Sequence, residues 1–98
     1  MDGEKIKLLS SELLTAAEIY KAAMVEKTPI YFSSLVKRLS KEPKKLSRGT
    51  ISRALERLND LHIIKSEWKK VNKKWVISLA IRGESEDFVK EIYERFLK

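Results

Sequence analysis

One stretch decides the fold: Leu46-Ser47-Arg48-Gly49-Thr50-Ile51-Ser52-Arg53-Ala54-Leu55-Glu56-Arg57-Leu58-Asn59-Asp60-Leu61. Its apolar residues recur at steps of three and four, at Ile51, Leu55, Leu58 and Leu61, which predicts an amphipathic helix over about 47–61. Ser47 is the expected N-cap. Leu46 before the cap and Ile51 at the fourth helical position have the spacing of a hydrophobic staple. The other faces of this helix carry mainly polar and basic residues.

Downstream, two β-prone runs, 63–70 and 74–81, predict a hairpin over about 63–82 that turns at Asn72-Lys73. In this register the residues Ile64, Ser66, Trp68 and Lys70 lie opposite Ile81, Leu79, Ile77 and Trp75, and all eight share one face. We expect Trp68 and Trp75 to pack into the core from this inward face, in preference to stacking on bases. Lys70 opposite Trp75 is placed for a cation–π contact.

The first half of the chain predicts two more helices. Apolar spacing from Ile6 to Met24 predicts a main helix over about 11–26, although the capping-box pattern 15–18 would also allow a helix start at residue 16. Pro29 follows, and 30–32 is a short β-prone run. Ser33 or Ser34 is then expected to cap a helix over 35–39, and 40–45 is a polar connector.

A last helix is predicted over about 84–98. Its first turn is acidic, which suits the positive end of a helix dipole. Its apolar stripe contains Phe88, Ile92, Tyr93 and Phe96, which is more apolar surface than a small monomer usually exposes. This stripe either covers the first helix or pairs with its copy in a homodimer, and we take these four residues as the candidate dimer interface.

The expected fold class is therefore mainly α with a small antiparallel β-hairpin, in a single domain over 1–98. The element order, and residues 46–65 in particular, resemble the recognition helix and wing of winged helix-turn-helix regulators of the prokaryotic MarR type. The sequence departs from their pattern at His62, where glycine is common because the backbone there tends to be left-handed. The connector before the third helix is also longer than the compact turn of a minimal motif.

The resemblance implies sequence-specific binding of double-stranded DNA in transcriptional regulation, with the third helix in the major groove and the wing on an adjacent groove or the backbone. The candidate contacts on and before the helix are Lys44, Lys45, Arg48, Thr50, Ser52, Arg53 and Arg57. Those on the wing are Lys69, Lys70, Lys73 and Lys74. Arginine suits guanine edges and phosphates, whereas lysine acts as a mobile charge. Thr50 and Ser52 could instead only favour the first helical turn.

The charge distribution favours a polyanionic partner. Of the overall net charge of +7, residues 33–83 carry +10, whereas the two flanks are slightly acidic. The same charge would permit RNA binding, and a winged helix can also be a protein-interaction module within a larger assembly. A solvated lysine-rich face remains the simplest alternative.

Other function classes find little support in the composition. The chain has no cysteine and one histidine, so we expect no catalytic activity, no metal site and no cofactor, and no small-molecule effector is evident. No apolar run is long enough to cross a membrane, and Met1–Lys5 is unlike a secretory signal, so a cytoplasmic location is expected. The absence of glutamine beside abundant lysine and glutamate is a bias found in proteins of hot-growing organisms.

Overall fold

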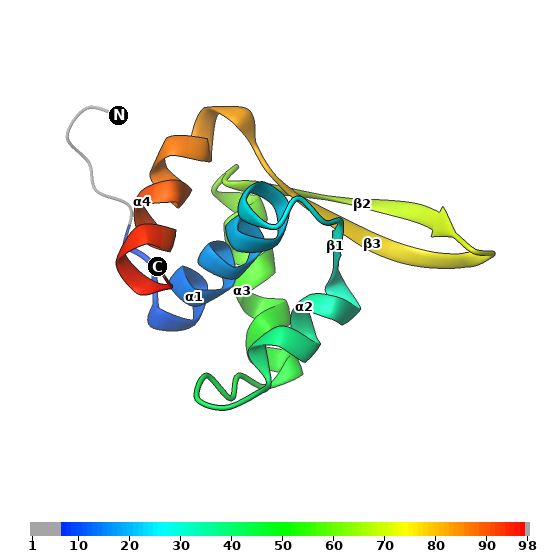
Figure 1. Ribbon diagram of the computed structural model, residues 1–98, viewed down its shortest axis with the longest axis horizontal. Coiled ribbons are helices and arrows are strands. Elements are labelled where there is room, and N and C mark those ends of the chain that lie inside the picture. Colours follow the sequence, from blue (N-terminus) through cyan, green and yellow to red (C-terminus); the bar gives the residue numbers. More distant parts are fainter. Residues whose placement is uncertain (1–6, 98) are drawn as a thin grey trace.

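The computed structural model describes residues 7–97. The elements, in chain order, are α1 (Ser10–Tyr20), the π-helical turn η1 (Lys21–Val25), β1 (Ile30–Tyr31), α2 (Phe32–Leu39), α3 (Arg48–Asp60), β2 (Ile64–Val71), β3 (Lys74–Ile81), the 3-10 turn η2 (Gly83–Ser85) and α4 (Glu86–Phe96) (Figure 1). The predicted class, mainly helices with a small antiparallel sheet in the predicted element order, is confirmed. Met1–Lys5, on which the location was partly argued, and Lys98, the predicted end of the last helix, lie outside the described residues.

The core forms where α1 meets the other three helices and the base of the sheet. Ile19, Leu35, Ile51 and Leu58 are fully buried in it, together with Val89 from α4. The hairpin of β2 and β3, called the wing below, projects from one end of the molecule, while α1 and α4 lie side by side at the other (Figure 1). No helix within residues 7–97 has the length and apolarity of a membrane span.

The register of the wing is as predicted. Ile64 pairs with Ile81, and Lys70 pairs with Trp75, while β1 adds to the outer edge of β3. Asn72 and Lys73 have φ angles of 51° and 67°, so both central residues of the turn are left-handed, as a type I′ hairpin turn requires. The turn and the alternation of side chains thus select one register.

The predicted burial of the two tryptophans is wrong. Trp68 is 66% exposed and Trp75 is 63% exposed. They lie on the predicted face of the hairpin, but the hairpin extends past the helices, and only Ile64 and Leu79 near its base are buried. Alternation defines the face of a strand but not how far along that strand the face is covered. The predicted cation–π contact is present, with Lys70 Nζ 5.9 Å from the Trp75 ring centre.

Two helix starts differ from the predictions. A start at residue 16 is wrong, because α1 begins at Ser10 and Thr15 is buried within it, donating from Oγ1 to the Ser11 carbonyl over 2.7 Å. The second helix begins at Phe32, three residues earlier than predicted. Neither serine is its N-cap; Ser34 lies one turn into α2, and its Oγ accepts the Tyr31 N–H over 2.9 Å.

A buried carboxylate joins α1, α2 and the connector. Glu18 is almost fully buried, and its Oε2 accepts a 2.8 Å hydrogen bond from Arg38 Nε. Lys44 Nζ lies 3.2 Å from Glu18 Oε1, an ion pair without a well-aligned hydrogen bond. Arg38 also donates two hydrogen bonds to Glu26, which hold the pKa of that carboxyl below its usual range. These contacts fix the path of the chain into α3.

The last helix, α4, packs against α1 but leaves part of its own apolar surface exposed to solvent. Its Val89 and Ile92 are buried against α1, and the Tyr93 ring centre lies 5.3 Å from that of Tyr20. Ile92 therefore packs largely within the protein's own core, as expected if the stripe covers the first helix, and its place in a dimer interface stays a prediction. Tyr93 is only partly exposed. Phe88 and Phe96, at 38% and 45% exposed, remain available for a further contact.

Candidate nucleic-acid interface

Helix α3 begins as its sequence predicts. Ser47 is the N-cap, and its Oγ accepts the Thr50 N–H over 3.1 Å. The Ser47 hydroxyl also donates to Thr50 Oγ1 over 2.9 Å. Leu46 packs against the core and Ile51 is buried, as expected of a hydrophobic staple. The Thr50 hydroxyl is thus part of the cap that starts the helix.

The exposed side of α3 changes in charge along its length. Ile51, Ala54, Leu55 and Leu58 face the core, so helical geometry turns Gly49, Arg53, Glu56 and Asp60 to the opposite side. A Cβ at Gly49 would lie 3.6 Å from Arg53 Nη1, which shows that the arginine extends back toward the helix start. The N-terminal half of this side is therefore basic, and the C-terminal half contains acidic residues.

One flank of α3 faces the wing. A hollow of about 310 Å³ lies between them and is lined by Phe32, Ser52, Leu55, Ser66, Glu67, Trp68 and Ile77. A second hollow of about 210 Å³ continues to Arg48 and Trp75. Asn59 ties the two elements together, because its Nδ2 donates to Ser66 Oγ over 2.9 Å and to the Leu55 carbonyl over 3.1 Å. The start of α3 and the inner face of the wing thus border one groove.

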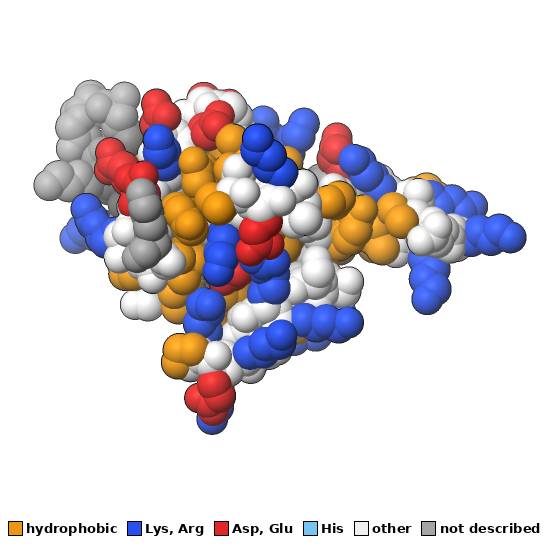
Figure 2. Space-filling model, viewed as in Figure 1, with side chains coloured by type: hydrophobic (Ala, Val, Ile, Leu, Met, Phe, Trp, Pro, Cys, Tyr) orange, Lys and Arg blue, Asp and Glu red, His pale blue; other side chains and the backbone are white. Residues whose placement is uncertain are grey.

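The wing ends in a cluster of cations. Lys69, Lys70, Lys73 and Lys74 are all exposed, and among residues 7–97 no carboxylate lies within ion-pair distance of them. Figure 2 shows basic side chains gathered at the free end of the wing, with hydrophobic side chains between that end and the body. This tip is therefore free to meet an anion.

The remaining predicted residues lie elsewhere or have other contacts. Lys44 pairs with the buried Glu18, and Lys45 pairs with Glu42 at 2.6 Å on the exposed connector. Arg57, on the flank of α3 away from the wing, donates to the Lys7 carbonyl over 3.1 Å. The structure therefore brings together Arg48, Ser52 and the inner face of the wing, with Arg53 on the adjoining exposed side of α3.

Two residues of the groove were not predicted from the sequence. Phe32 was assigned to a strand but opens α2, where its ring lies 4.9 Å below the Arg48 guanidinium. The sequence around Asn59 did not predict its link to the wing, because the residue is only a polar position near a helix end. Its role depends on the distance between α3 and β2, which spacing along the chain does not determine.

Comparison with known proteins identifies the fold. No protein-family model matches the sequence, and no curated protein matches it in sequence. Among solved structures, the circadian clock associated protein Pex from Anabaena superposes with a TM-score of 0.70 at 17% identity, over 97% of this chain and 84% of that one. SSV1 F-93 gives 0.67 at 15% identity, over 94% and 91% of the two chains.

Longer proteins match as well. Lactococcus lactis ZitR gives a TM-score of 0.68 at 17% identity, over 99% of this chain, which spans only 60% of the ZitR chain. A PadR family transcriptional regulator from Eggerthella lenta gives 0.62 at 19% identity, over 85% and 70%. At these identities the similarities establish the winged-helix fold alone. The closer resemblance to MarR-type regulators stays a prediction.

Proposed function

We propose that this protein is a transcriptional regulator that binds double-stranded DNA sequence-specifically, with α3 in the major groove and the wing on the adjacent groove or backbone. The observation that carries the proposal is the basic start of α3 beside a wing whose tip bears four exposed lysines. A second support is that α3 presents its basic half outward, with no described segment of the chain lying over it. Similar structures include regulators described as transcriptional.

The chemistry divides between the two elements. Arg53 extends along the exposed side of α3 and can bind the O6 and N7 of a guanine, while Ser52 lies beside it at the edge of the groove. Arg48, which lies over the Phe32 ring, is suited to clamp a phosphate because its planar fork of N–H donors fits two phosphate oxygens. The wing lysines neutralise backbone phosphates without reading sequence.

The other predicted contacts receive supporting roles in this proposal. Thr50 completes the helix cap, Lys44 neutralises buried Glu18, and Arg57 holds the segment before α1. Lys45 keeps an exposed ammonium group next to the start of α3 and remains a candidate for a phosphate.

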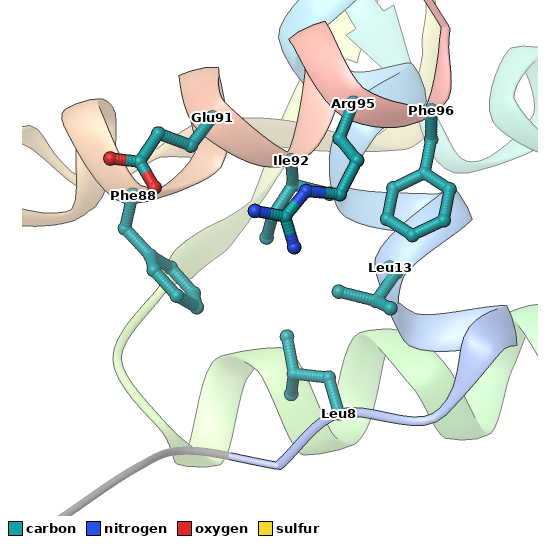
Figure 3. A pocket seen from close by; sticks show the side chains of 7 residues that line it. All are labelled: Leu8, Leu13, Phe88, Glu91, Ile92, Arg95 and Phe96. Atoms are coloured by element: carbon teal, nitrogen blue, oxygen red, sulfur yellow. The ribbon is translucent and has the colours of Figure 1, made fainter.

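The proposal includes a homodimer formed through α4. A hollow of about 240 Å³ lies between α4, the start of α1 and the segment before it, lined by Leu8, Leu13, Phe88, Glu91, Ile92, Arg95 and Phe96 (Figure 3). Arg95 points into this hollow between the two phenylalanines. In a two-fold interface the same surface meets itself, so Arg95 of each copy could pair with the partner copy's acidic α4 surface. Two copies would present two α3 helices to neighbouring half-sites.

The dimer is tested by sedimentation at tens of micromolar protein. The expected result is a mass twice that of the chain, reduced to the monomer in a Phe88→Glu/Phe96→Glu variant. A monomer of 11.4 kDa in the wild type would remove the dimer from the proposal.

DNA recognition is tested by selecting bound duplexes from a random pool and measuring affinities by fluorescence anisotropy. Arg53→Ala should lower affinity for the selected duplex by about 1–3 kcal/mol and relax the preference at one base pair. Lys90→Ala, which removes an exposed cation from α4, is the matched control and should change little. Equal binding by the wild type and an Arg48→Ala/Arg53→Ala variant would refute the role of α3. Competition with single strands and with duplex RNA separates the proposal from RNA binding.

A further inference from the structure

The two wing tryptophans form an exposed aromatic surface that duplex binding does not explain. Trp68 and Trp75 are diagonal neighbours on the same face of the hairpin, since Trp68 pairs with Ile77 and Trp75 with Lys70. Both are about two-thirds exposed, and no described element of the chain covers them. Such an exposed pair of large aromatic side chains usually marks a binding surface.

Cations alternate with the aromatic rings around this surface. Lys70 Nζ lies 5.9 Å from the Trp75 ring centre, and the Arg48 guanidinium lies 4.9 Å from that of Phe32. The two hollows between α3 and the wing are lined by three aromatic side chains, and Glu67 is the one acidic residue among their lining residues. Exposed aromatic faces beside fixed positive charge are the features of sites that stack nucleobases and hold their phosphates.

We propose that the groove between α3 and the wing binds unpaired nucleobases, which stack on Trp68 and Trp75 while Lys70 and Arg48 hold the flanking phosphates. The inference rests on the proposed DNA binding and extends it from paired to locally unpaired DNA. Inside a duplex each base face is covered by its neighbours, so an indole can stack only on a base that has left the helix. Among the lining residues Arg48 and Glu67 offset each other, and Lys70 beside Trp75 adds the positive charge that favours a nucleic acid strand over an apolar protein segment as the occupant.

The test compares three forms of one DNA sequence: the full duplex, the same duplex with a short internal mismatch bubble, and the single strand. The wild type should bind the bubble more tightly than the duplex, and its tryptophan fluorescence should be quenched by the bubble more than by the duplex. Trp68→Ala should weaken bubble binding about tenfold or more, and Trp75→Ala likewise, because each stacked base contributes on that order. Duplex affinity should change less than about twofold.

The conservative variant Trp68→Phe/Trp75→Phe is the matched control, since it retains two stacking rings. It should keep most of the preference for the bubble. Because both side chains are exposed, the variants should unfold at the same urea concentration as the wild type, which removes misfolding as an explanation.

Three results would overturn the inference. One is equal affinity of the wild type for duplex and bubble, which leaves the proposed duplex binding intact. Another is an equal loss of affinity for the duplex and for the bubble in the alanine variants, which would show that the tryptophans contribute to ordinary duplex binding. The third is a fall in sedimenting mass on replacing the tryptophans, which would show that a second copy occupies the groove. Absence of any DNA binding would instead refute both proposals.

Discussion

Removing the wing lysines gives a quantitative test of their contact with DNA. The perturbation is the quadruple change Lys69→Gln, Lys70→Gln, Lys73→Gln and Lys74→Gln. All four ammonium groups are exposed and without an acidic partner in the described chain, so each can displace a condensed counterion. With about 0.9 ions released per phosphate contact, the slope of log affinity against log salt should become less negative by about 3.6. Between 50 and 200 mM salt, wild-type affinity should fall about 150-fold more than that of the variant.

The assay is a series of anisotropy titrations of one duplex at several salt concentrations. Lys90→Gln is the control, and its slope should match that of the wild type because Lys90 lies on α4. The variant should keep its sequence preference, since α3 is unchanged. An unchanged slope in the quadruple variant would refute the assignment of the wing to the phosphate backbone. A slope change of about 0.9 or less would leave at most one lysine in contact.

The remaining predictions concern stability. Leu58→Ala should lower the free energy of unfolding in urea by about 2–5 kcal/mol, because Leu58 is fully buried. His62→Gly should raise the melting temperature, with a gain of about 1 kcal/mol, because exposed His62 has a left-handed φ of 61°. Arg38→Met should cost about 2 kcal/mol, since Glu18 stays buried with one cation fewer. Hydrogen bonds from Arg38 lower the pKa of Glu26. The stability that this pair contributes should therefore begin to fall as the pH drops below the usual glutamate pKa, and should be lost as the pH passes through the lowered pKa. Arg38→Met should weaken this pH dependence. A change in the opposite direction in the urea, thermal or pH measurement would refute the role given to the corresponding residue.

Local patterns were sufficient to predict the elements that depend on local physics. The cap at Ser47, the staple of Leu46 and Ile51, and the register around Asn72-Lys73 each involve residues close in sequence, so their chemistry is visible in the chain. The left-handed backbone at His62 was expected for the same reason. The fold class followed from the order of these elements.

The clearest error, the predicted burial of the tryptophans, concerns a feature that depends on distant contacts. Trp68 has the alternation of a buried position, but whether it is covered depends on where the helices end beneath the sheet. The ion pair of Lys44 was not predicted, because its partner, Glu18, lies on a helix far earlier in the chain. Ile92 belongs to an apolar stripe that is only partly used by α1, and spacing alone cannot divide such a stripe between a core and an interface.

The central claim is that the start of α3 and the wing form one DNA-binding surface. Its most direct test is an amide chemical-shift map of the isotopically labelled protein titrated with its selected duplex. The expected shifts lie in the first half of α3, from Arg48 to Arg53, and at the wing tip around Asn72, while the amides of α4 near Lys90 move little. Shifts confined to α4, with α3 and the wing unchanged at saturating duplex, would contradict the account.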